Sequence, residues 1–372
     1  MRVRNIAIAA ALLGTASVLP GACLLPEIGI EERDPPSDAG ADAETGCKRA
    51  FYPPPPKVGD AMSIEPIVVA IRSINMGDGA AGTPGFDLDF TCTCFQDAGE
   101  TCSTGASAPQ CDEEGGIDNE SSDLFRQLVN NLGPQFFGST YYSKSAEIGN
   151  WSVLVRVSEY SGKTDDPSVK VALYVSPGFV APEVPAWDGA DEWPVSEDSL
   201  GPSADISDPI YVSNGAYVAG GVLVATLPSA GFRLSGGNST ITVRILGGVL
   251  SGTFEFTDQG TRLTKGTLAG RWSEKAAFES LSSFRGPPVQ PGAPALKLCV
   301  GDPFYNAIKA AVCSARDILT DPLLPASAKC DAISLGIGFE TYPARLGPVR
   351  PIVAPSEGCT PEKDPAIDSC PQ

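Results

Sequence analysis

The sequence predicts a mainly β protein, an antiparallel β-sandwich of jelly-roll type with about three short α-helices and a set of bracing disulfides. Three observations support this prediction. Apolar and polar residues alternate in several stretches, which is typical of antiparallel strands buried on one face. Turn-forming sequences such as Asn-Gly separate these stretches. Strands and helices do not alternate regularly, so a doubly wound parallel sheet is not expected.

From about Ile64 onward, apolar residues recur at every second position, as expected of strands. The first has Ile67, Val69 and Ile71 on one face. Further strands with the same period are expected at 151–158, 169–175, 241–245 and 332–341. Hairpins are expected at Asn214-Gly215, at 235–238 and at 258–260.

Three helices are expected to interrupt the strands. Each should begin at a capping residue, which is Ser121 or Ser122 in the first, Ser273 in the second and Asp302 before Pro303 in the third. The first should end at 133–134 and the third at Pro322.

The first residues have the features of an export signal. Arg2 and Arg4 precede an uncharged run at 6–19, and small residues stand before Cys23. A membrane-spanning helix needs about 20 apolar residues, so the run is too short to span. We therefore expect residues 1–22 to be a signal peptide.

The end of this segment, Pro20-Gly21-Ala22-Cys23, resembles the lipobox of bacterial lipoproteins that are cleaved by signal peptidase II. The resemblance implies that Cys23 is lipidated and becomes the first residue of the mature chain. Because Leu24 follows, it also implies anchoring to the outer membrane or cell surface. Simple secretion, with Cys23 removed or left as a thiol, is the alternative.

The cysteine count agrees with lipidation. The chain has 11 cysteines, and an odd number in an exported protein leaves one to be explained. Setting Cys23 aside leaves ten for five bridges in an oxidising compartment. These ten are Cys47, Cys92, Cys94, Cys102, Cys111, Cys299, Cys313, Cys330, Cys359 and Cys370. We expect Cys92 and Cys94 each to pair with Cys102 or Cys111, and the suggested further pairs are Cys313–Cys330, Cys359–Cys370 and Cys47–Cys299.

Composition divides the mature chain into two parts. Residues 23–62, after the lipidated cysteine, are acidic and rich in proline, which predicts a stalk. Residues 63–372 are expected to form a single disulfide-braced β-sandwich domain that ends in a helix, a strand and a cysteine-rich tail.

Composition also excludes several functions. The chain has no histidine, so it has no Ser-His-Asp triad, Cys-His dyad or HExxH zinc site. Its net charge is −19, and removing 1–22 takes away two arginines and no acid, which leaves −21. Such a surface repels phosphate backbones, so nucleic acid is not an expected partner. No cofactor is required by these residues.

Acidic residues flank the central cysteines. Asp87 and Asp89 alternate along one predicted strand, and Asp118 and Asn119 follow a glycine pair. Calcium binds six to eight carboxylate, amide and carbonyl oxygens, so these four residues are the predicted ligands of a structural calcium ion. Their alternative role is to end strands and form turns.

An acidic loop contains two tryptophans. Trp187, Asp188 and Trp193 lie between two prolines, where aromatic rings could stack on sugars and a carboxylate could accept their hydroxyl hydrogen bonds. Alternatively, the rings cover the edge of the sandwich.

The predicted function is that of an envelope- or surface-anchored lipoprotein with a non-enzymatic binding or structural role, whose partner is a glycan or an envelope protein. A carbohydrate-binding or carbohydrate-active protein is the alternative, because glycoside cleavage needs only two carboxylates and Glu255 lies on a predicted strand.

Overall fold

The computed structural model describes residues 49–57, 63–79, 82–95, 101–104, 110–133, 138–236, 239–286, 293–351 and 358–371. The predicted signal peptide, the predicted lipidation site Cys23, Cys47 and most of the predicted stalk lie outside these residues. Within the described ranges, no helix is both long enough and apolar enough to cross a membrane.

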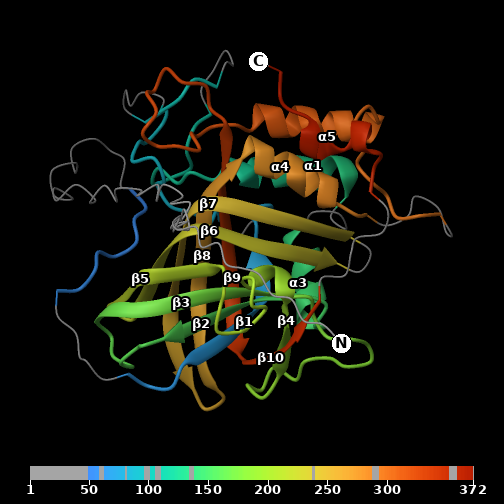
Figure 1. The fold of residues 1–372 in the computed structure, drawn as a ribbon. Helices are drawn as coiled ribbons and strands as arrows, with labels where there is room; N and C mark the ends of the chain where they lie inside the picture. The colour runs from blue at the N-terminus through green and yellow to red at the C-terminus, as the bar shows by residue number, and fades with distance from the viewer. Residues whose placement is uncertain are drawn as a thin grey trace, which may run out of the picture. The chain divides into compact units, whose positions relative to one another are not determined.

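Eight antiparallel strands of the described chain form one closed barrel, in which each strand pairs with the next and β1 pairs with β9 (Figure 1). They are β1 (Ile67–Asn75), β2 (Ser152–Ser158), β3 (Asp166–Ser176), β5 (Tyr211–Ala219), β6 (Val222–Gly236), β7 (Ser239–Thr257), β8 (Gly260–Ser273) and β9 (Ala332–Pro343). The mainly β, antiparallel class is confirmed. The strands form one continuous sheet that closes on itself, where two packed sheets were expected.

The hairpin predicted at Asn214-Gly215 is wrong. β5 continues through both residues, and its pairing with β3 shifts register there, so they form a bulge. The chain turns instead at Gly220-Gly221, where both glycines have positive φ. The predicted hairpin at 258–260 is confirmed as the β7–β8 connection. The one predicted at 235–238 falls where β6 and β7 pair, at Gly236 and Ser239, and residues 237–238 lie outside the described residues.

Four helices lie within the described residues: α1 (Glu120–Leu132), α3 (Ser139–Glu147), α4 (Glu274–Ser283) and α5 (Pro303–Ser314). Helices α1, α4 and α5 gather at one end of the barrel (Figure 1). These are the three predicted helices, although Asn119 and not Ser121 or Ser122 precedes α1, without a side-chain cap hydrogen bond, and α5 ends well before Pro322. Helix α3 was not predicted, because the side chains that it buries are those of Tyr142, Ser145 and Ala146 and give only a weak apolar stripe.

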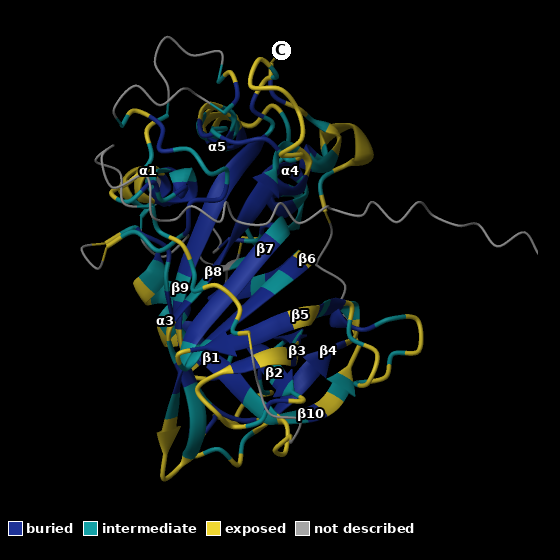
Figure 2. Cartoon of the chain, turned by 90° about the vertical axis from the view of Figure 1, so that its left-hand side faces the viewer, coloured by how far each residue is buried: buried dark blue, intermediate teal, exposed yellow. Residues whose placement is uncertain are grey.

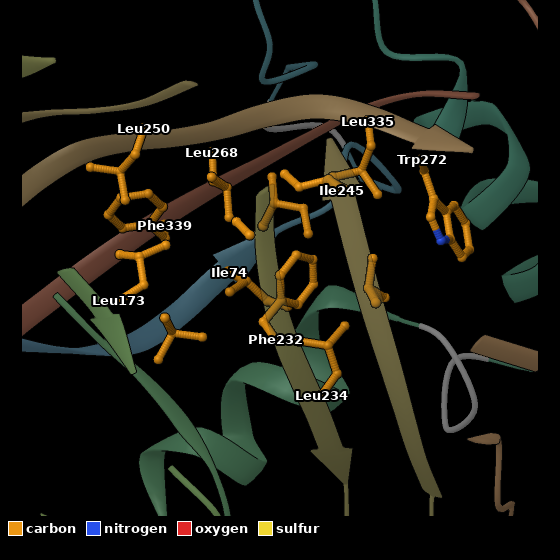
Figure 3. Close-up of a cluster of buried hydrophobic side chains, with 14 of the residues drawn as sticks. Ile74, Leu173, Phe232, Leu234, Ile245, Leu250, Leu268, Trp272, Leu335 and Phe339 are labelled. Carbon is orange, nitrogen blue, oxygen red and sulfur yellow. The ribbon is translucent and has the colours of Figure 1, made fainter. Parts of the chain in front are cut away.

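The barrel interior is filled with apolar side chains. Phe232, Ile245, Leu268 and Phe339 from four strands point toward one another (Figure 3). Buried residues predominate along the strands, with intermediate and exposed stretches on some of them, and many exposed residues lie in the loops and on the helices' outer faces (Figure 2). The outer face of the sheet is also covered over much of its area, by two separate groups of loops.

One cover consists of residues 179–200 and 344–350, here called the tryptophan cover. It contains a two-stranded parallel sheet of β4 (Glu192–Ser196) and β10 (Arg345–Arg350). Trp187 and Trp193 pack with Tyr174 on the outer face of the barrel.

The other cover consists of residues 82–95 and 110–118, here called the acidic cover. Its Phe86 and Leu88 pack on the outer face of the barrel with Val224 and Val249. Residues 49–57, which composition assigned to the stalk, lie against this cover, and the Tyr217 hydroxyl donates to the Pro53 carbonyl at 2.6 Å.

Four disulfides join described cysteines: Cys94–Cys111, Cys102–Cys330, Cys299–Cys359 and Cys313–Cys370. Cys92 is also disulfide-bonded. Cys94–Cys111 is one of the expected pairings, but the expectation that Cys92 pairs with Cys102 or Cys111 is wrong, because these two are bonded to Cys330 and Cys94. The suggested pairs Cys313–Cys330, Cys359–Cys370 and Cys47–Cys299 are also wrong, because the C-terminal tail returns to the body of the domain, where Cys370 bonds Cys313 on α5 and Cys359 bonds Cys299.

Candidate metal centre

Three predicted ligands converge in the acidic cover. Phe86 and Leu88 pack on the sheet. The predicted strand that carries Asp87 and Asp89 is wrong, because residues 82–90 are irregular backbone with a bend at 88–90. The Asp118 N–H donates to the Phe86 carbonyl at 3.0 Å, which aligns the two segments of the cover. One carboxylate oxygen from each aspartate lies within 4.8 Å of the others. The sequence therefore identified three residues that the fold brings together.

Backbone amides hold two of these carboxylates. Asp118 Oδ2 accepts hydrogen bonds from the N–H groups of Leu88, at 2.5 Å, and Asp89, at 3.2 Å. Asp89 Oδ1 accepts from the Thr91 N–H at 2.9 Å, and its Oδ2 from the Thr101 hydroxyl at 2.5 Å. Asp118 Oδ2 thus uses both of its lone-pair sites, whereas each Asp89 oxygen accepts one of these bonds and keeps a further lone pair. The bonds orient both carboxylates and leave the Asp89 oxygens able to bind a cation.

Asp87 differs from the other two aspartates. Its side chain has no exposed surface, and neither of its oxygens accepts a hydrogen bond of normal geometry from any residue that the structure describes. The guanidinium of Arg49, itself partly exposed, lies 3.6 Å from Asp87 Oδ2.

Asn119 is not in position to be a ligand. Its Oδ1 accepts hydrogen bonds from the Gly336 N–H at 3.1 Å and the Ser121 hydroxyl at 2.6 Å. Its Nδ2 donates to the carbonyls of Pro84 and Gly336. The amide is therefore fully used in fastening the acidic cover to β9, and the prediction that it binds a metal is corrected.

Three more carboxyl groups, which the sequence interpretation missed, adjoin the aspartates. Asp112, Glu120 and Asp317 line a small polar pocket beside Asn119. Asp112 could have been noticed because it follows Cys111. Asp317 could not, because it comes from the segment after α5, where its carboxylate holds the N–H and hydroxyl of Ser334.

All six carboxyl groups have a raised pKa, and together they are called the acidic cluster: Asp87, Asp89, Asp112, Asp118, Glu120 and Asp317. Burial is the largest cause in each case, and it raises the pKa of Asp87 to about 7 and that of Glu120 to about 8. Neighbouring carboxylates add to the effect; Asp89 raises the pKa of Asp87 further. The cluster thus resists carrying its full negative charge.

The nearby positive charges are few. Arg271 is buried beneath the cluster, donates to the Leu88 carbonyl at 2.6 Å, and has a pKa lowered by its own burial. Among the described residues, the guanidinium of Arg49 lies 3.6 Å from Asp87, and the charge of Arg126 partly offsets the raised pKa of Glu120. Two like charges 4 Å apart repel by about 4 kcal/mol at an effective dielectric constant of 20. Six neighbouring carboxyl groups therefore resist being ionised all at once.

The second predicted site is not exposed. The ring of Trp193 is fully buried and Trp187 is 7% exposed, and their centroids lie 5.1 Å apart within the tryptophan cover. Asp188 is exposed, and its carboxylate accepts the Ala190 N–H within its own turn. The rings thus cover the sheet, as in the alternative interpretation, and do not form a platform for sugars.

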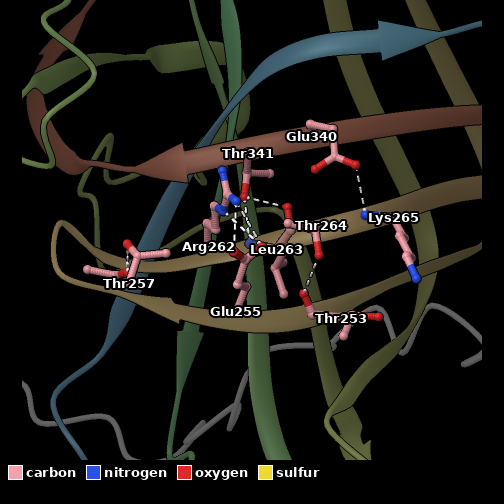
Figure 4. A network of polar contacts seen from close by, with 10 residues as sticks. Thr253, Glu255, Thr257, Arg262, Leu263, Thr264, Lys265, Glu340 and Thr341 are labelled. Carbon is pink, nitrogen blue, oxygen red and sulfur yellow. Dashed lines mark hydrogen bonds and ion pairs between the residues drawn. The ribbon is translucent and has the colours of Figure 1, made fainter.

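Glu255 is neutralised by a neighbour. It forms a bidentate ion pair with Arg262 on β8, with contacts of 2.8 and 2.9 Å from Nη2, in the polar network of Figure 4. The same network includes the Thr341 hydroxyl, which bonds the backbone of Leu263. Glu255 therefore has a structural partner rather than the environment of a catalytic acid.

The fold and the cluster define a disulfide-braced, closed antiparallel barrel with buried carboxyl groups on its outer face. No family model matches the chain, and comparison with curated proteins and with solved structures finds no significant match. The function must therefore follow from the chain's own residues.

Proposed function

We propose that this chain is an exported lipoprotein, anchored to the bacterial outer membrane or cell surface through a lipid on Cys23, whose barrel is a non-enzymatic binding or structural module. The observation that carries the proposal is the state of the cysteines. All nine in the described ranges are disulfide-bonded, which supports an oxidising compartment.

The count of cysteines that remain after the four described bridges supports the lipid anchor. The four described bridges use eight cysteines, so the partner of Cys92 is one of the two others in the sequence, Cys23 and Cys47. We assign it to Cys47, which is close in sequence to residues that contact the acidic cover. Cys23 is then the odd cysteine, and it stands at the end of the signal-like segment.

The chemistry of the acidic cluster supports a non-enzymatic role. Asp118 and Asp89 bind backbone N–H groups of their own cover, and Asp317 binds Ser334 on β9. Carboxylates used in this way hold segments of chain in place. The proposed partners are an envelope protein or glycan, and the membrane is contacted through the lipid alone.

The test is metabolic labelling with a palmitate analogue in a bacterial host that makes lipoproteins. Wild type should be labelled and Cys23→Ser should not. Cys47→Ser is the matched control, because it removes a cysteine from the same part of the chain and should keep the label. Equal labelling of wild type and Cys23→Ser would contradict the anchor.

A further inference from the structure

The acidic cover contains a buried carboxyl group, that of Asp87, whose ionic partner among the described residues is the partly exposed Arg49. Both oxygens of Asp87 lack a hydrogen-bond donor among the described residues, although the side chain is fully buried. Buried polar atoms in folded proteins are nearly always paired, and an unpaired carboxylate is among the most costly. The nearest positive atom, on Arg49, is 3.6 Å away on a partly exposed side chain, so it compensates only in part.

Asp87 is aimed at two further carboxylates. Its oxygen lies within 4.8 Å of oxygens of Asp89 and Asp118. The segments that carry them are fixed by backbone hydrogen bonds and by the Cys94–Cys111 disulfide. The fold thus holds three acidic oxygens around one point and prevents them from separating.

We propose that Asp87, Asp89 and Asp118 bind one calcium ion, which fastens the two segments of the acidic cover to each other. This goes beyond the proposed function, because it requires neither the lipid anchor nor a partner.

The donor set selects the type of cation. The chain has no histidine, and the described cysteines are in disulfides, so the site offers only oxygen atoms. Oxygen donors suit calcium, magnesium and manganese and do not suit zinc or copper.

Calcium binds oxygens at about 2.4 Å, so ligands on opposite sides of the ion are about 4.8 Å apart. The spread of the three aspartate oxygens is within this limit. Magnesium, at about 2.0–2.1 Å, demands a tighter and more regular octahedron.

Protonation is the competing explanation of the same geometry. Burial raises the pKa of Asp87 to about 7, so a proton could relieve the repulsion where no cation is bound. Cation binding and protonation predict different results in a binding experiment, since only the first gives a stoichiometric calcium complex.

The experiment is a calorimetric titration of calcium into the purified, chelator-treated full chain, with magnesium as a separate titrant. We expect one calcium per chain with a Kd of about 10⁻⁴–10⁻³ M, as in other extracellular modules, and weaker binding of magnesium. Asp87→Asn should weaken calcium binding at least about tenfold, since it removes one charged ligand. Asp188→Asn, the same substitution in the tryptophan cover, should bind like wild type.

Near-ultraviolet circular dichroism checks that each variant is folded. If Asp87→Asn does not fold, Asp89→Asn is measured in its place, with the same expected loss. The proposal is overturned if wild type binds no calcium up to about 10 mM, well above the expected Kd, or if a folded variant lacking one of the three carboxylates binds as wild type does. Neither result would affect the labelling of Cys23.

Discussion

The two covers of the barrel are held in different ways. The tryptophan cover contains no cysteine, and its buried contacts are apolar rings and aliphatic side chains. The acidic cover buries only a few apolar residues, such as Phe86 and Leu88, and is crossed by disulfides and lined by carboxyl groups. The difference shows that the same sheet can be covered mainly by buried rings and aliphatic side chains, supplemented by hydrogen bonds such as that from Trp187 Nε1 to the Glu147 carbonyl, or by cross-links around carboxyl groups.

The largest effect is expected from removing the central ring of the tryptophan cover. Trp193→Ala should lower the free energy of unfolding by about 3–5 kcal/mol, because it leaves a large cavity in a fully buried site. Denaturant unfolding at equilibrium measures this, and the loss should be the same with calcium and with chelator. A loss below about 1 kcal/mol would show that the ring is not essential to this cover.

The disulfide of the acidic cover should have the next largest effect. Cys94→Ser/Cys111→Ser should lower stability by about 3 kcal/mol, because the bridge closes a loop of 17 residues. It should also weaken calcium binding, since the two segments are then free to separate. Unchanged calcium affinity in the double variant would mean that backbone contacts alone fix the carboxylates.

The variant Asn119→Ala distinguishes a structural role of this side chain from a role in metal binding. Asn119→Ala should cost about 2 kcal/mol, because it leaves backbone groups of Pro84 and Gly336 without partners. Calcium should stabilise this variant as much as wild type, as compared by thermal melting in both conditions. If the stabilisation by calcium disappears instead, the amide is a ligand, as the sequence suggested.

The smallest change in stability is expected from a substitution of Asp188. Asp188→Asn changes an exposed turn residue in the tryptophan cover, so its unfolding free energy should stay within about 0.5 kcal/mol of wild type. A calcium-dependent change in its stability, seen by the same melting experiment, would show that calcium acts on the surface charge in general rather than on the acidic cover.

Much of the barrel was predictable because its signals are local. Alternation identified β1, β2, β3, β7 and β9, and the capping residues Ser273 and Asp302 marked where α4 and α5 begin. Asn214-Gly215 misled because the same pair that favours a tight turn also fits a bulge, and the shift in register depends on β3, which is distant in sequence. Closure of the sheet through β1 and β9 is likewise a long-range property.

In the site, too, features that depend on local sequence were predictable and features that depend on distant segments were not. Asp87 and Asp89 were predicted to share one strand face; their oxygens do lie close together, but on irregular backbone that is aligned with the Asp118 segment by hydrogen bonds. The role of Asn119 depends on β9, more than 200 residues away, and local sequence carries no sign of it. The tryptophans look like an exposed platform in sequence because their loop is acidic and rich in proline, whereas burial is decided by the sheet beneath them.

The central claim, that the acidic cover is held by a cation, is tested most directly by one difference: the melting temperature in about 10 mM calcium minus that in chelator. At ten to a hundred times Kd, the ion should raise the melting temperature of wild type by about 3–5 °C. Asp87→Asn should show almost no difference, and in chelator it should melt no lower than wild type, because one of the repelling charges is gone. Equal melting temperatures of wild type in the two conditions would contradict the account.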